Sequence, residues 1–197
     1  LEGIYDAFVS RIAEAARSIK VGSADDPETL VGPVIDAEAR ARIEGYQTLA
    51  ESEGRVVFRG EVGDLGTRGH FVPPLIVADV APSSKLAQEE IFGPVLSIIK
   101  AKDLDNALRI ANGTQYALTG SIYSRSPDHI EQARRAFRVG NLYINRGTTG
   151  AMVDRQPFGG FKMSGIGTKT GGPDYLLEYM LTRSVSENTM RRGFAPD

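Results

Sequence analysis

The sequence predicts an α/β protein with an open, mainly parallel sheet that helices cover on both faces. Between residues 95 and 145, short β-branched segments alternate with helical patterns, at the spacing of parallel strands joined by right-handed crossovers. A glycine-rich segment follows the last of these strands, where open α/β sheets bind their ligands. The chain has 197 residues, 41% of them apolar, which is enough for one domain with its own core.

The first half of the chain predicts two helices and two strands. Apolar residues three and four positions apart predict a helix over the first twenty residues. Asp36 is placed to cap a second helix, which Gly54 ends. Residues 56–59 predict a strand. Residues 71–80 predict an extended segment, and its two prolines favour either a sheet edge or an irregular strand. The predicted buried stripes are Ile4, Phe8, Ile12, Ala15, Ala16 and Ile19 on the first helix, and Ala39, Ile43, Tyr46 and Ala50 on the second.

The second half continues the alternation. Residues 95–99 are apolar and β-branched, which predicts a strand buried on both faces. Asp103 begins a helix, Ser126 and Pro127 form the cap and first turn of another, and strands are expected at residues 120–124 and 142–145. Residues 175–180 predict a helical turn. Residues 181–187 alternate as an edge strand does, and we expect this strand to pair with another subunit.

Residues 145–172 contain eight glycines. Glycine loses more backbone freedom on folding than any other residue, so this density indicates positive φ angles or close approach, as at a ligand site. A flexible linker is the alternative, but the segment carries large apolar residues that linkers lack, among them Met152, Val153, Phe158, Phe161 and Ile166. Asn145 is interpreted as a turn former. Arg155 and Lys162 are interpreted either as solvated rim charges or as groups that steer an anionic substrate.

Composition argues against several classes of function. The net charge of −2 gives no basic surface for nucleic acid. The chain has no cysteine and only two histidines, so we expect no metal site and no thiol nucleophile. No apolar run approaches the roughly 18 residues of a membrane span, and no secretion signal is present, so we expect a cytoplasmic protein. The chain begins at Leu1, inside a helical pattern, which we interpret as a piece of a longer protein.

The segment QEEIFGPV, residues 88–95, also carries chemistry. A carboxylate can accept hydrogen bonds from both hydroxyls of a ribose, and such charge-assisted bonds are worth about 1.5 to 3 kcal/mol each. Alternatively, Glu89 and Glu90 are only solvated and Phe92 belongs to the core. The local pattern leaves both interpretations open.

Three segments together resemble the carboxyl-terminal part of the NAD(P)-dependent aldehyde dehydrogenase superfamily. They are QEEIFGPV, PFGGFKMSG and ANGTQYALTG, and the resemblance covers essentially the whole chain, although Ala117 stands where the family usually has glycine. The resemblance implies the α/β catalytic domain of that family, with NAD as cofactor. It also implies that Glu90 contacts the nicotinamide ribose and that Phe92 packs beside the nicotinamide ring, while Glu89 is structural.

Within the superfamily, NRGTTGAMVDRQPFGGFKMSG and KTGGPDYLLEYM are similar to the 1-pyrroline-5-carboxylate dehydrogenases, which oxidise glutamate semialdehyde to glutamate in proline catabolism. The resemblance implies that the backbone N–H groups of Gly150 and Ala151 hold the carboxylate of the substrate. It implies that Phe158 packs on the aliphatic chain of the substrate. Short turns beside glycine can aim two amides at an anion, and an aromatic ring excludes water from methylene groups.

The family mechanism requires a cysteine nucleophile, a glutamate base and a dinucleotide-binding domain, none of which is visible in this sequence. We therefore expect no catalytic residue in this chain and no activity of the chain alone. Residues 1–180 are interpreted as the catalytic domain without its nucleophile segment, and residues 181–197 as an oligomerisation strand and tail of at least a dimer. The longer protein is either a stand-alone enzyme or a bifunctional proline-utilisation protein.

Two other hypotheses remain. In one, the chain belongs to an aldehyde dehydrogenase of other specificity, and Gly150, Ala151 and Phe158 bind a different acidic aldehyde. In the other, the chain is a non-catalytic homologue that acts through assembly, with its last strand added to the sheet of another subunit.

Overall fold

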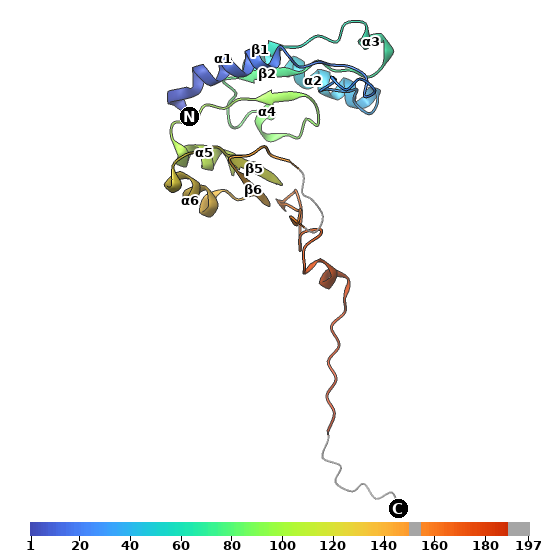
Figure 1. The fold of residues 1–197 in the computed structure, drawn as a ribbon, viewed down its shortest axis with the longest axis vertical. Coiled ribbons are helices and arrows are strands. Elements are labelled where there is room, and N and C mark those ends of the chain that lie inside the picture. Colours follow the sequence, from blue (N-terminus) through green and yellow to red (C-terminus); the bar gives the residue numbers. More distant parts are fainter. Residues whose placement is uncertain (150–154, 189–197) are drawn as a thin grey trace, which may run out of the picture.

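The computed structural model describes residues 1–149 and 155–188 (Figure 1). Helices and strands alternate along most of the chain, which confirms the α/β class. The helices are η1 (Glu2–Ile4), α1 (Tyr5–Ala16), α2 (Ala37–Glu53), α3 (Leu65–Arg68), α4 (Lys85–Gln88), α5 (Leu104–Ala111), α6 (Pro127–Ala136) and η2 (Tyr175–Tyr179). The strands are β1 (Arg55–Arg59), β2 (Leu75–Ala78), β3 (Val95–Ser97), β4 (Tyr116–Ala117), β5 (Thr119–Ile122), β6 (Asn141–Ile144) and β7 (Phe161–Lys162).

The described strands form three sheets where the sequence predicted one. The largest has the order β1-β2-β3, with β1 antiparallel and β3 parallel to β2. Strands β5 and β6 pair in parallel around the crossover helix α6, as predicted. Strands β4 and β7 form a short antiparallel pair. In Figure 1, α5 and α6 accompany β5 and β6, and the three-stranded sheet lies with α1, α2 and α4.

Two predictions about strand environment were wrong. Strand β2 is the central strand of its sheet rather than an edge, and all four of its residues are buried. Pro73 and Pro74 precede β2 instead of interrupting it, so their missing N–H groups cost the ladder nothing. Strand β3 lies at the edge of the sheet within the described chain, and Leu96 is 43% exposed.

Helix α1 buries part of the predicted stripe. Ala16 is buried and Ile12 packs on the same core, as Ile19 does beyond the helix, but the first turns differ. Tyr5 and Val9 are buried, whereas Ile4 and Phe8 are 62% and 49% exposed. The Tyr5 hydroxyl donates to the Ile98 carbonyl at 3.3 Å and accepts from the Asp79 N–H at 2.7 Å. These two bonds hold α1 against the ends of β2 and β3. Helical spacing alone did not distinguish the two neighbouring apolar stripes.

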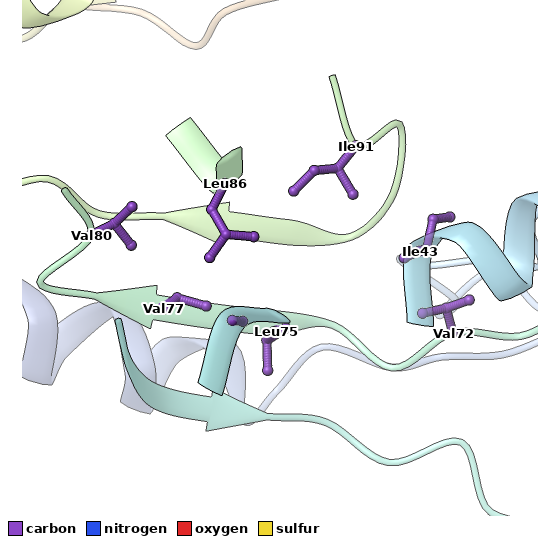
Figure 2. Close-up of a cluster of buried hydrophobic side chains, with 8 residues drawn as sticks. Ile43, Val72, Leu75, Val77, Val80, Leu86 and Ile91 are labelled. Carbon is purple, nitrogen blue, oxygen red and sulfur yellow. The ribbon is translucent and has the colours of Figure 1, made fainter. Parts of the chain in front are cut away.

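Helix α2 agrees with its prediction. The Asp36 carboxylate caps it by accepting from the Ala39 N–H at 2.7 Å, and Gly54 follows its last residue. Ile43 and Ala50 are fully buried. Figure 2 shows the core cluster that α2 forms with β2 and with the segment carrying Leu86 and Ile91. The buried residues of this cluster are Ile43, Ala50, Val72, Leu75, Val77, Val80, Leu86 and Ile91.

The remaining helices begin where their caps predicted. Asp103 accepts from the Asn106 N–H at 2.8 Å, and Ser126 accepts from the His129 N–H at 3.4 Å, with Pro127 in the first turn of α6. The predicted helical turn near residue 175 is η2. The expected strand at residues 181–187 differs: residues 181–188 are exposed, have no strand pairing within the described chain, and run away from the body in Figure 1. Their pairing with another subunit stays a prediction.

Two features are absent from residues 1–149 and 155–188. Over these residues, no helix has both the length and the apolar character that crossing a membrane requires. Within the same ranges, no three or more histidine or acidic side chains are grouped as a metal ion would need.

Replacing Tyr5 by phenylalanine tests the attachment of α1. The variant loses both hydroxyl bonds and leaves the Asp79 N–H without this acceptor, so we expect the free energy of unfolding to fall by about 1 to 3 kcal/mol. Burial raises the pKa of Tyr5 above its ordinary value of 10. A raised folded-state pKa stabilises the fold fully below pH 10, and this stabilisation is lost as the pH rises through the folded-state pKa. Urea unfolding should be measured from neutral to alkaline pH. The difference in free energy of unfolding between the unaltered protein and Tyr5→Phe should become smaller above pH 10.

Candidate functional site

The loop from Glu89 to Gly93 connects α4 to β3. Residues fixed by a hydrogen bond or by burial alternate in it with residues whose side chains are exposed. The Glu89 carboxylate accepts a hydrogen bond from the Tyr46 hydroxyl at 2.6 Å, and Ile91 is buried in the core. Glu90 is exposed, and Phe92 is 79% exposed. The interpretation of Phe92 as a core residue was therefore wrong. The loop leaves one carboxylate and one aromatic ring free for a ligand.

The backbone of Phe92 is in the left-handed region, with φ of +53°. This conformation is uncommon for residues other than glycine, and for a bulky side chain it costs about 1 to 3 kcal/mol. Such strain persists only where the surroundings hold it, and it is concentrated at functional sites. The exposed position of the Phe92 ring therefore depends on a strained backbone conformation.

Gly93 brings the loop into contact with α2. A Cβ atom at this position would lie 2.7 to 2.8 Å from three side-chain atoms of Ile43, which is itself fully buried. Ile43 has no room to move away, so only glycine permits the approach. Gly93 thereby fixes the position at which the loop enters β3.

Glu90 borders a hollow of about 300 Å³ between the loop and the second half of the chain. Neither Phe92 nor Phe158 lines it. The other lining residues come from the end of α5, the β4–β5 region, the end of α6 and the segment after β7; they are Ala111, Thr114, Tyr116, Ala117, Leu118, Thr119, Phe137, Val139 and Ser164.

The glycine-rich segment begins at a firmly held turn. Asn145 has φ of +54°, and its side-chain amide pairs with Ser124, accepting from the N–H at 2.8 Å and donating to the carbonyl at 2.9 Å. The interpretation of Asn145 as a turn former is confirmed. Beyond it, the Thr148 hydroxyl donates to Ser121 at 2.8 Å, and the Tyr143 hydroxyl donates to the Thr149 carbonyl at 2.5 Å. The ends of β5 and β6 thus fix the segment as far as Thr149.

The predicted substrate residues are described only in part. Gly150 and Ala151 lie outside the described residues, and their role stays a prediction. Phe158 is half-buried, and its backbone forms two hydrogen bonds of 3.0 Å with Thr170. Asn141, which the sequence analysis missed, fixes this region by donating to the Pro157 carbonyl at 2.9 Å and accepting from the Gly159 N–H at 3.3 Å.

Several glycines in this segment, and Gly140 just before it, permit close packing or turns within the chain. A Cβ atom on Gly140 would lie 1.8 Å from the Gly159 carbonyl oxygen, and one on Gly160 would lie 2.5 Å from Ser164 Cβ. Gly167 and Gly171 adopt positive φ angles in turns. The described part of the segment is hydrogen-bonded at Phe158 and in β7, so the linker interpretation was wrong for these residues.

Lys162 has a structural role in the described chain. Its ammonium group donates to the Asn112 carbonyl at 2.7 Å and to the Thr114 carbonyl at 2.8 Å. The cation thus joins β7 to the end of α5, while the residue itself remains exposed. Its steering of an anionic substrate stays a prediction. Arg155 is exposed.

Comparison with protein families identifies this architecture. The aldehyde dehydrogenase family matches residues 1–185. The chain belongs to the aldehyde dehydrogenase family. Among sequence relatives, it is 49% identical to 1-pyrroline-5-carboxylate dehydrogenase of Geobacillus sp. (strain WCH70), an alignment that covers 95% of this chain and 36% of the relative. It is 46% identical to the enzyme of the same name from Bacillus subtilis, over 94% of this chain and 36% of the relative.

Solved structures give the same assignment. Proline utilization A from Bdellovibrio bacteriovorus, inactivated by N-propargylglycine, is 56% identical with a TM-score of 0.89, over 98% of this chain and 20% of that chain. A Thermus 1-pyrroline-5-carboxylate dehydrogenase with bound NAD is 45% identical with a TM-score of 0.82, over 89% of this chain and 33% of that chain. These similarities confirm the resemblance inferred from the sequence motifs. The chain spans about a third of the length of the curated relatives it matches.

Replacing Gly93 by alanine tests the packing of the candidate cofactor loop. The added methyl overlaps fully buried Ile43, so we expect the free energy of unfolding to fall by about 1 to 3 kcal/mol. Gly45 is the matched control, because it lies in α2 with no atom within 4 Å of an added Cβ. Gly45→Ala should raise stability by about 0.5 to 1 kcal/mol through helix propensity. Equal effects of the two changes in urea unfolding would contradict the close approach.

Proposed function

We propose that this chain is the carboxyl-terminal part of an NAD-dependent 1-pyrroline-5-carboxylate dehydrogenase, which oxidises glutamate semialdehyde to glutamate. The observation that carries the proposal is the exposed pair Glu90 and Phe92 on a loop held at the residues between and beside them. Relatives near half identity that bear this enzyme name support the choice of activity. The relative from Bdellovibrio supports a bifunctional proline-utilisation protein as one possible parent.

The two exposed residues suit a nicotinamide nucleotide. NAD, when bound, accepts a hydride from the substrate. The Glu90 carboxylate can accept from the hydroxyls of a ribose, and the Phe92 ring can pack beside the nicotinamide. NAD bound to the Thermus and Mycobacterium tuberculosis relatives supports NAD as the cofactor here.

The substrate end of the proposed site lies along the glycine-rich segment. In the proposal, the backbone N–H groups of Gly150 and Ala151 bind the carboxylate of glutamate semialdehyde, and Phe158 packs on its two methylene groups. The hydrogen-bonded turn up to Thr149 and the hydrogen-bonded backbone of Phe158 support this arrangement, because they fix the chain on both sides of the proposed carboxylate site. An aromatic wall orients an aliphatic chain and excludes water from it.

The proposal includes the assembly and activity of the protein. The sequence has no cysteine, so the nucleophile of the family must come from a part of the enzyme other than these residues, and the chain alone is inactive. Residues 1–180 would form most of the catalytic domain. Residues 181–197 would add a strand to a second subunit, giving at least a dimer in the cytoplasm. The exposed course of residues 181–188 supports that role.

Phe158 is tested in the full-length polypeptide that carries this sequence. Each methylene removed from water contributes about 0.8 kcal/mol, so Phe158→Ala should raise KM for glutamate semialdehyde about tenfold. A short alkyl aldehyde lacks the carboxylate and the matching chain, and its KM should change much less. Steady-state kinetics with both aldehydes checks this. Equal losses on the two substrates would contradict the role of Phe158.

Glu90 is tested by the nearly isosteric change Glu90→Gln. A charge-assisted hydrogen bond becomes a neutral one, which should weaken NAD binding and slow hydride transfer by about five- to tenfold. Single-turnover measurement of NADH formation separates this step from product release. An unchanged rate of hydride transfer would show that Glu90 is only a solvated carboxylate.

A further inference from the structure

Helix α2 holds the loop of Glu90 and Phe92 through polar contacts as well as through packing. The Arg42 guanidinium donates to the Ile91 carbonyl at 2.5 Å, and the Tyr46 hydroxyl donates to the Glu89 carboxylate at 2.6 Å. Residues four apart lie on the same side of a helix, so both donors reach the loop from one stripe of α2. Their acceptors, on Glu89 and Ile91, flank Glu90 in the sequence.

We propose that Arg42 and Tyr46 are positioning residues for the cofactor, which fix the loop so that Glu90 and Phe92 meet NAD in the correct orientation. The inference rests on the proposed function. Neither residue touches the cofactor in this proposal. Both act through the backbone and side chain of the loop.

The loop needs such support because its own backbone supplies little. Within the described part of the chain, the N–H groups of residues 90–92 donate to no backbone carbonyl. The left-handed conformation of Phe92 is costly, and the neighbouring residues must hold it. Gly93 limits only one end of the loop, where it packs on Ile43. The bonds from Arg42 and Tyr46 fix the other end and the middle.

The Tyr46 contact persists at physiological pH. The hydrogen bond to the Glu89 carboxylate is the main cause that raises the pKa of Tyr46 above its ordinary value of 10. Tyr46 therefore keeps its proton and remains a donor throughout the neutral range. The interpretation of Glu89 as structural agrees with this contact.

Arg40 provides a matched control on the same helix. Its guanidinium donates to the Gly66 carbonyl at 2.9 Å and pairs with Glu44 at 2.8 Å. Arg40 thus holds the segment around α3 in the way that Arg42 holds the cofactor loop. Replacing Arg42 removes one cation and its contact to the Ile91 carbonyl. Replacing Arg40 removes one cation, its contacts to the Gly66 and Gly69 carbonyls and its pairing with Glu44, in a part of the chain that carries neither Glu90 nor Phe92.

The experiment compares Arg42→Ala, Arg42→Lys, Tyr46→Phe and Arg40→Ala in the full-length polypeptide. The Kd for NAD is measured by calorimetry, hydride transfer by single-turnover NADH formation, and KM for glutamate semialdehyde by steady-state kinetics. Loss of one hydrogen bond corresponds to a change of about three- to tenfold in a binding constant or a rate. We expect Arg42→Ala and Tyr46→Phe to raise the Kd for NAD and slow hydride transfer by that factor, with KM for the aldehyde little changed.

The control variants distinguish a positioning role of Arg42 and Tyr46 from a general contribution to stability. Arg40→Ala should lower the thermal stability as Arg42→Ala does, yet leave the Kd for NAD unchanged. Arg42→Lys keeps a donor that can reach the Ile91 carbonyl, so it should restore part of the affinity. Tyr46→Phe preserves the ring and its packing, so it remains informative if Arg42→Ala does not fold.

The outcomes separate this inference from the proposed function. If the unaltered protein binds no NAD, the proposed function fails. If it binds NAD and Glu90→Gln weakens that binding, while Arg42→Ala and Tyr46→Phe do not, only the positioning role is overturned. An equal loss of NAD affinity in Arg40→Ala and Arg42→Ala also overturns it, because the effect would then reflect general destabilisation.

Discussion

The packing of α2 against β2 and the loop before β3 is the constraint on which the rest of the structure depends. Ile43 and Ala50 are fully buried on this side of α2, and Ile43 meets the backbone of Gly93. Full burial of an isoleucine side chain contributes about 1.5 to 3 kcal/mol, so the helix cannot shift without a large loss. The same contact determines where the loop begins its path into the sheet. The packing of Ile43 on Gly93 therefore contributes to the stability of the fold and also fixes the position of the candidate site.

The sequence predicted best those features that are encoded locally. Asp36, Asp103 and Ser126 cap helices because a short polar side chain reaches an N–H three residues ahead. The buried stripe of α2 and the parallel strands around α6 followed from spacing in the same way. The caps and the stripe of α2 depend on residues within one or two helical turns, and the pairing of β5 with β6 follows from the short crossover through α6.

The incorrect predictions concern features that distant partners determine. The order of β1, β2 and β3 depends on which segments meet, and two prolines before β2 were misread as an edge signal. The buried face of the first turns of α1 was decided by the bonds that Tyr5 makes near residues 79 and 98. No local pattern contained that information. Similarly, Gly159 was counted in the glycine-rich segment as a sign of a ligand site, but it lies close to Gly140, nineteen positions earlier in the chain.

The candidate site shows the same division. The residues proposed to contact the cofactor, Glu90 and Phe92, were found from a motif, but the residues that hold their loop were not. Arg42 and Tyr46 carry no local sign of their role, because an arginine and a tyrosine on a half-exposed helix are ordinary. Only the fold brings α2 beside the loop.

The two parts of the proposed site differ in the kind of support they have. The loop of Glu90 and Phe92 is held largely by side chains of α2, whereas the region of Phe158 is held by paired backbone and by the Asn141 amide. A side-chain contact is lost when its one residue is replaced, whereas most replacements keep the backbone N–H and C=O groups that form a backbone pair. The cofactor end can therefore be adjusted by changes on α2 that leave the substrate end intact. Such separation lets a fold of this kind vary its substrate while keeping one way of holding its cofactor.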